Sequence, residues 1–281
     1  MKSTLTPIGV RDYSPEETEA LSRLKQEILA QLSSSGYRRV LTPSLEFYET
    51  IRDGLGPKLA KQCIKFTDSH GQTLVLRPDH TAAIARSLST RYSDESLPIR
   101  LAYVDPVFRK DPQRGETEEW QAGVEHIGDE SIAADVAVID QCIQCLKACG
   151  ITDFGIDLGH TDVLASYSED EQAALLDGDY TILDNLPKRG GIECLDEFPA
   201  LKSLYQDIQS SGYIDDRVQA NLGLVKDPSY YSGMIFDVYV PGYGKRLGSG
   251  GRYDGLLSRF GRDLPAVGFA LDLGAIQEYL A

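Results

Sequence analysis

Positive charge is scarce in this sequence. Its 281 residues include 28 lysines and arginines against 43 aspartates and glutamates, so the formal net charge at pH 7 is −15. The sequence isoelectric point is correspondingly low, near 4.7. A field of this sign repels the phosphate backbone of nucleic acids. The composition therefore does not favour a protein that works by gripping RNA or DNA.

Long apolar runs are also absent from the sequence. No stretch approaches the roughly 20 apolar residues that cross a bilayer, and residues 1–12 contain no apolar core of the signal-peptide kind. We therefore expect a cytoplasmic protein without a membrane span. The chain is 42% hydrophobic and 25% charged, which is ordinary for a globular protein, and it is long enough to bury a core as a single domain.

Cysteines are few and odd in number, which does not fit a disulfide framework. Cys142, Cys145 and Cys149 form a C-x-x-C-x-x-x-C pattern that could indicate a metal or iron–sulfur site. Their spacings of three, four and seven also place them on one face of a helix with Val138. We favour a buried apolar stripe, and we expect neither a metal nor another cofactor.

The expected elements begin with a helix capped by Ser14, with Pro15 at its first position and Glu17 completing a capping box. Asp79 or Thr81 could cap a later helix. No short parallel βαβ rhythm follows, which predicts an α+β fold with an antiparallel-rich sheet. We expect strands at 37–42, 63–67, 73–76, 99–108, 153–158 and 234–240, helices after 14, 43–46, 77–81 and 131, and a mostly helical inserted subregion at 160–220 with a loop at 187–191.

Residues 107–128 predict two strands joined by a polar loop. Side chains alternate along a strand, so Gln121, Gly123 and Glu125 share one face of the second strand. An amide and a carboxylate on either side of a glycine leave room for backbone or for a small polar ligand, and Arg109 could bind a carboxylate. An exposed face on an edge hairpin explains the same pattern.

The segment 248–254, GSGGRYD, is rich in glycine. It has neither the spacing of a dinucleotide fingerprint nor the Lys-Ser/Thr of a P-loop. We interpret it as backbone that passes close to a ligand, with Tyr253 on the helix that follows.

Several stretches, taken together and in order, resemble the catalytic core of histidyl-tRNA synthetase, a class II aminoacyl-tRNA synthetase. The resemblance covers most of the chain and implies a single class II-like domain over residues 1–281, an antiparallel sheet flanked by helices, and a dimer formed through the first motif. The matching stretches are GVRDYSP at 9–15, GYRRVLTPSLE at 36–46, LRPD at 76–79, FR at 108–109 with QAGVE at 121–125, SGGRYDGLL at 249–257 and VGF at 267–269.

The sequence departs from the synthetase pattern at the positions where that family binds ATP and tRNA. Ala275 aligns with the motif-three arginine, the loop 116–119 is acidic where the synthetase places arginine, and Lys226 replaces a catalytic arginine. Phosphates need fixed cations. The chain also stops at Ala281, with no room for the anticodon-binding domain. The resemblance therefore implies a protein without catalytic residues of its own that does not bind tRNA.

The positions that match the family's histidine pocket are kept. This combination is similar to the regulatory-subunit family of hetero-oligomeric ATP phosphoribosyltransferase, in the first step of histidine biosynthesis. That likeness implies a homodimer within a hetero-oligomer, which activates a short-form catalytic subunit and mediates feedback inhibition by L-histidine. The expected histidine-binding residues are Asp79, in place of the family's glutamate, Arg109, Gln121, Glu125, Tyr231 and Tyr253.

Within such a pocket, the carboxylates Asp79 and Glu125 would meet the ammonium or imidazole of histidine, and Arg109 with Gln121 its carboxylate. The tyrosines would pack against the ring. Two alternatives stay open at this point. One is a synthetase-like enzyme that activates an amino acid, and the other is a histidine-binding regulatory module for a different partner.

Overall fold

The computed structural model describes residues 5–110, 115–177, 189–190, 195–211 and 217–281. A nine-stranded sheet forms the centre of this part of the chain. All neighbours from β5 to β7 are antiparallel, whereas β1 and β9 pair in parallel with β5 and β7. In spatial order the strands are β1 (Arg38–Arg39), β5 (Ile99–Phe108), β6 (Glu118–Ile127), β12 (Ala266–Asp272), β11 (Gly248–Arg252), β10 (Met234–Tyr239), β7 (Gly155–His160), β9 (Val218–Asn221) and β8 (Arg189–Gly190).

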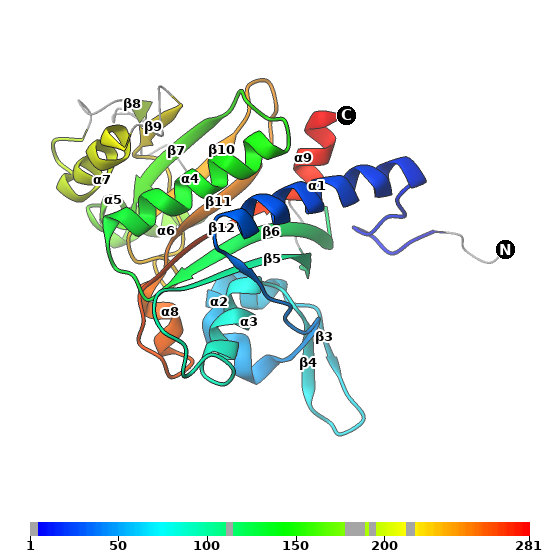
Figure 1. Cartoon of the computed structure of the whole chain (residues 1–281). Helices are drawn as coiled ribbons and strands as arrows, with labels where there is room; N and C mark the ends of the chain where they lie inside the picture. Colours follow the sequence, from blue (N-terminus) through cyan, green and yellow to red (C-terminus); the bar gives the residue numbers. More distant parts are fainter. Residues whose placement is uncertain (1–4, 111–114, 178–188, 191–194, 212–216) are drawn as a thin grey trace.

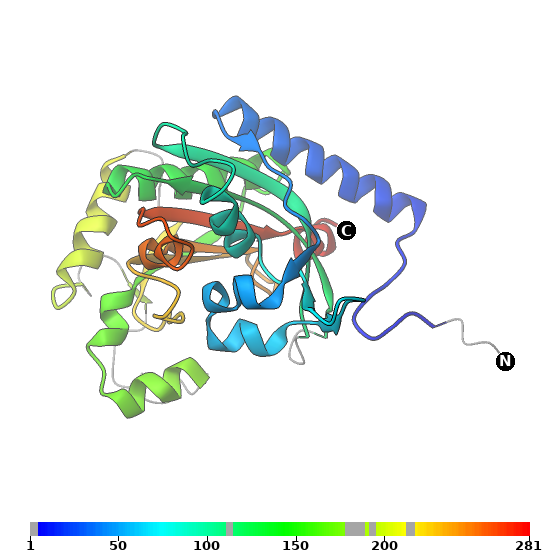
Figure 2. The same cartoon turned by 90° about the horizontal axis from the view of Figure 1, so that it is seen from below.

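Helices cover both faces of this sheet, which confirms the predicted α+β class. Figures 1 and 2 show α1 and α4 on one face and α2 and α6 on the other. The helices are α1 (Pro15–Ser34), α2 (Tyr48–Gln62), α3 (His80–Leu88), α4 (Ile132–Ala148), α5 (Thr161–Ala165), α6 (Glu169–Asp177), α7 (Pro199–Ser210), α8 (Asp254–Ser258) and α9 (Leu273–Leu280). None of the described helices is both long and apolar enough to cross a bilayer.

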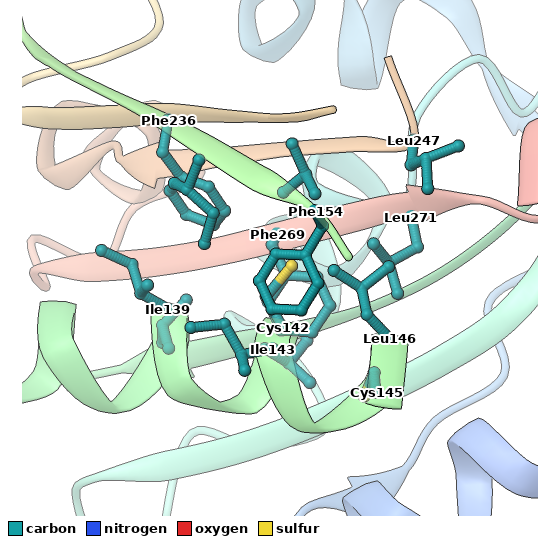
Figure 3. Close-up of a cluster of buried hydrophobic side chains, with 14 of the residues drawn as sticks. Ile139, Cys142, Ile143, Cys145, Leu146, Phe154, Phe236, Leu247, Phe269 and Leu271 are labelled. Atoms are coloured by element: carbon teal, nitrogen blue, oxygen red, sulfur yellow. The ribbon is translucent and has the colours of Figure 1, made fainter. Parts of the chain in front are cut away.

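The main core lies between the sheet and α4. Figure 3 shows Cys142 of α4 among apolar side chains that include Phe154, Phe269 and Leu146. Cys142 and Cys145 are fully buried, and burial raises the pKa of the Cys149 thiol to about 12. The predicted buried stripe is confirmed for these cysteines, while Cys194 lies outside the described residues.

The sequence placed several local features correctly. Ser14 caps α1 and forms a reciprocal capping box with Glu17, and Asp79 caps α3. The hairpin predicted at 63–67 and 73–76 is present as β3 (Lys65–Thr67) and β4 (Thr73–Leu76).

Other local predictions were wrong. Residues 37–42 contain only the two-residue β1, and 43–46 do not lead directly into a short helix. Instead, β2 (Leu45–Phe47) joins β4 and β3 in a separate three-stranded sheet, and the 15-residue α2 follows it. The inward residue of β2 is Glu46, which is bonded to Arg86 at 2.9 Å. A buried glutamate hides the alternation that marks a half-buried strand.

The region 160–220 also contributes strands. Helices α5, α6 and α7 are present, but β8 and β9 extend the central sheet, and Arg189–Gly190 belongs to β8 rather than to the predicted loop. The rest of that predicted loop, at 187–188 and 191, lies outside the described residues. Such short edge strands are specified by their pairing partners rather than by a local pattern.

Candidate functional site

A cavity of about 880 Å³ opens between the sheet and the segments that include α2 and α6. Its floor comes from the strands β6, β11 and β12, and its walls include Leu55 of α2 and Leu175 of α6. All of the residues predicted for the histidine pocket line it, although they come from distant parts of the chain. These residues are Asp79, Arg109, Gln121, Glu125, Tyr231 and Tyr253.

Glu125 lies at the bottom of the cavity and is 1% exposed. The Thr81 hydroxyl donates to Glu125 Oε1 at 2.6 Å, and the Tyr253 hydroxyl donates to Oε2. Burial, reinforced by the charge of Asp79, raises the pKa of Glu125 to about 8 against the opposing effect of these two hydrogen bonds. The edge-hairpin explanation was therefore wrong, because β6 lies between β5 and β12 and this face is buried.

Two glycines allow the strands to approach closely beside Glu125. A Cβ at Gly268 would lie 2.3 Å from Glu125 Oε2, so the absence of a side chain makes room for the carboxyl group. A Cβ at Gly123 would lie 2.5 Å from the hydroxyl oxygen of Tyr103, which donates to the carbonyl of Phe269 at 3.3 Å. A Cβ at Gly123 would also lie 2.1 Å from the backbone oxygen of Phe269. Of the two occupants expected beside this glycine, the backbone is therefore the one present, and with Tyr103 it leaves no space there for a ligand.

Asp79 both caps a helix and lines the cavity. Its Oδ1 accepts the backbone N–H of Ala82 at 2.8 Å and so caps α3, which was the structural alternative for this residue. Its Oδ2 faces the cavity and lies 3.9 Å from Arg109 Nη2. Burial raises the pKa of Asp79, and the charge of Arg109 opposes that shift.

Arg109 stands in a charged corner of the cavity. Its Nε donates to the carbonyl of Pro78 at 2.6 Å, which fixes the guanidinium. Its Nη1 lies 4.0 Å from Glu119 Oε2, and the side-chain amide of Gln121 donates to the other oxygen of Glu119 at 2.6 Å. Arg109 and Gln121 are therefore close together as predicted, but Glu119 lies between them.

Aromatic rings form one wall of the cavity. The ring of Tyr230 lies 4.9 Å from that of Tyr231 and 5.9 Å from that of Tyr253, measured between centroids. Tyr253 immediately precedes α8 and does not lie on it as predicted. The glycine-rich segment before it is β11, a strand inside the sheet whose residues 248–251 line the cavity.

Sequence reasoning missed Glu119, Tyr103 and Tyr230, and it treated Thr81 only as a helix cap. Tyr230 had a signal, because it is adjacent to Tyr231 in the sequence. The others reach the cavity through strand pairing and helix placement that no short motif encodes.

Lys226, which replaces an arginine of the synthetase pattern, is held by contacts within the protein. Its Nζ lies 2.9 Å from Asp237 and donates to the carbonyls of Phe236 at 2.8 Å and Gly250 at 3.1 Å. A lysine has three N–H donors, and these contacts use them all. Burial lowers the pKa of Lys226 to about 8.

Comparisons with known proteins point in one direction. The family model described as histidyl-tRNA synthetase matches residues 9–175 and 174–276. The ATP phosphoribosyltransferase regulatory subunit of Symbiobacterium thermophilum is 35% identical, over 96% of this chain and 78% of its own length. That of Moorella thermoacetica is 34% identical, over 95% and 79%.

Solved structures agree with the sequence comparisons. A Bacillus halodurans protein described as an ATP phosphoribosyltransferase regulatory subunit/histidyl-tRNA synthetase superposes with a TM-score of 0.88 at 32% identity, over 99% of this chain and 83% of its own. Histidyl-tRNA synthetase from S. aureus superposes with a TM-score of 0.72 over 99% and 70%, and at 21% identity it shows the fold alone.

Proposed function

The chain belongs to the histidyl-tRNA synthetase family, in the branch of the ATP phosphoribosyltransferase regulatory subunits, and we propose that it regulates histidine biosynthesis by binding L-histidine in the cavity above Glu125. In this proposal the chain has no catalytic activity of its own. It activates a short-form catalytic subunit of ATP phosphoribosyltransferase, and bound histidine reverses that activation. The observation that carries the proposal is the buried carboxyl of Glu125 beside the charged corner around Arg109.

A zwitterionic amino acid matches this arrangement of charges. Its carboxylate would pair with Arg109, whose Nη atoms lie about 4 Å from the neighbouring carboxylates and so have no hydrogen bond to them. Its ammonium would lie near Asp79, and its imidazole would reach Glu125 and Tyr253. The reverse orientation, with the imidazole near Asp79 and the ammonium near Glu125, uses the same residues. Tyr231 would pack against the ring.

At the positions where the synthetase family has cations for amino-acid activation, this chain has side chains that are held by other contacts, uncharged or acidic. This supports a regulatory function over an enzymatic one. Lys226 is tied to the carbonyls of β10 and β11. Ala275 is buried in the first turn of α9, where it offers no cation for a phosphate. Glu119 places a negative charge next to Arg109.

Regulation would follow from ordinary linkage. If histidine binds one quaternary state of the complex more tightly than another, it shifts the population toward that state. The coupling is reciprocal, so substrates of the catalytic subunit should weaken histidine binding by the factor by which histidine weakens theirs.

Calorimetric titration of the purified chain with L-histidine tests the binding part of this proposal. We expect saturable binding to the wild type and an affinity about tenfold or more lower for Glu125→Gln, because a hydrogen bond to a charged group is lost. Glu130→Gln, which removes an exposed carboxylate outside the cavity, is the matched control and should bind like the wild type. Equal affinities of all three proteins would place histidine elsewhere or reject it as the ligand.

A further inference from the structure

Two cations that line the cavity share one carboxylate. Oδ1 of Asp237, on β10, lies 2.9 Å from Lys226 Nζ, and its Oδ2 lies 3.2 Å from Arg246 Nη1. Although burial alone would raise the pKa of Asp237, the charges of Lys226 and Arg246 lower it. The carboxylate is therefore ionised and holds both cations beside the cavity.

The two cations differ in the hydrogen-bond donors that they can still offer. Lys226 spends its three N–H groups on Asp237 and on two backbone carbonyls. Arg246 contacts the two oxygens of Asp237 through Nη1 alone, at 3.3 and 3.2 Å. Within the described part of the chain, neither Nε nor Nη2 of Arg246 has a hydrogen-bond partner. Arg246 can therefore donate to a ligand, whereas Lys226 cannot.

Arg246 is also accessible to a ligand, because its side chain is 35% exposed and lines the cavity. Ser249 of β11 pairs with Asp237 across the sheet, and directly paired residues share one face. Ser249 lines the cavity as well, and its hydroxyl has no hydrogen bond to another residue that the structure describes. A guanidinium and a hydroxyl at neighbouring positions are donors that suit a carboxylate.

We infer that Arg246 is a further ligand-binding residue of this cavity and donates to the carboxylate of the bound amino acid. It takes over from Lys226, which stands where the synthetase pattern has an arginine and has no donor left. A carboxylate has two oxygens with about four lone-pair positions, so this contact is chemically compatible with the one proposed for Arg109. The inference deepens the proposed function, on which it rests for the identity of the ligand.

Arg246→Gln tests this inference, because Asp237 keeps Lys226 as its partner when the arginine is removed. L-Histidine and histamine are titrated separately into the wild type, Arg246→Gln and Lys245→Gln. Histamine has the amine and the imidazole of histidine but lacks its carboxylate. Lys245→Gln is the matched control, since it makes the same change in net charge at an exposed neighbour that pairs with Glu278.

We expect Arg246→Gln to bind L-histidine at least about tenfold more weakly than the wild type, because a charge-assisted hydrogen bond is lost. Its affinity for histamine should not be lower than that of the wild type, and Lys245→Gln should bind both ligands like the wild type. Equal affinities of Arg246→Gln and the wild type for L-histidine would overturn the inference. A loss that is equal for histidine and histamine would overturn it as well, because it would not depend on the carboxylate.

Arg246→Lys keeps the inference testable if Arg246→Gln does not fold. It preserves a cation beside Asp237 but loses the planar set of donors, so it should bind L-histidine more weakly than the wild type and histamine equally well. Unchanged affinity of Arg246→Lys for both ligands would count against the inference. Absence of L-histidine binding to the wild type would instead remove the proposed function, and this inference with it.

Discussion

Glu125 is the single residue on which the proposed site depends most. It is buried under Thr81 and Tyr253, and its Oε2 occupies the space that a side chain at Gly268 would need. A carboxyl in such a place resists ionisation, which is why its pKa is raised to about 8. A cationic ligand group would reverse this effect, because it would restore a partner for the ionised form.

The raised pKa of Glu125 makes the stability of the empty protein depend on pH. Below the unfolded-state pKa of 4.5 the Glu125 carboxyl is protonated in both the folded and the unfolded protein. At such pH its ionisation does not reduce the stability of the fold. As the pH rises toward 8 the unfolded state releases its proton first, and the folded state loses stability in comparison. The loss should be on the order of 3 kcal/mol between about pH 5.5 and 8.

Urea unfolding of the wild type and Glu125→Gln at several pH values measures this effect. The variant has no titrating group at this position. The difference between its unfolding free energy and that of the wild type should therefore shift in favour of the variant as the pH rises. Parallel pH profiles of the two proteins would show that Glu125 titrates normally and is not in the environment described.

Residue-scale reasoning from the sequence found those cavity residues that lie in recognisable stretches. Strand alternation and residue chemistry pointed to Arg109 and Glu125, and the resemblance placed them in one pocket with Asp79. Tyr103 and Glu119 were missed for a physical reason. On an isolated strand each is an unremarkable residue, and only the pairing of β5 with β6 and the placement of α3 bring them against the site.

At the scale of elements, α4 shows where sequence periodicity is reliable. Its apolar residues and cysteines recur at helical spacing, and that stripe packs on the sheet as expected. The two-residue strands β1 and β8 show the opposite case. A strand of that length has too few residues for an alternating pattern, so its existence depends on a neighbour distant in the sequence.

The buried stripe of α4 predicts the effect of a polar substitution. Cys142→Ser should destabilise the fold by about 1–3 kcal/mol, because a hydroxyl replaces a thiol among apolar side chains. Guanidinium unfolding measures the change, and Cys149→Ser, at the less buried end of the helix, should cost less. Unchanged stability in Cys142→Ser together with stoichiometric metal in the wild type would contradict the stripe and favour a cluster.

At the scale of the whole molecule, the central sheet lies between the main hydrophobic core and the cavity. Helices α1 and α4 cover one face of the sheet (Figures 1 and 2). The main core lies on that face, and the residues that line the cavity lie on the other. Leu55 of α2 and Leu175 of α6 reach the cavity from outside the sheet. A ligand held in the cavity would therefore lie against both the sheet and these two helices.

We propose that this chain sets the rate of another enzyme in response to histidine. The direct measurement is the rate of a short-form ATP phosphoribosyltransferase subunit alone, with this chain, and with this chain plus saturating L-histidine. We predict stimulation by the chain and its reversal by histidine, with Glu125→Gln requiring about tenfold or more histidine for the same reversal. A catalytic rate that the chain does not change, or a stimulated rate that histidine does not change, would contradict this proposal.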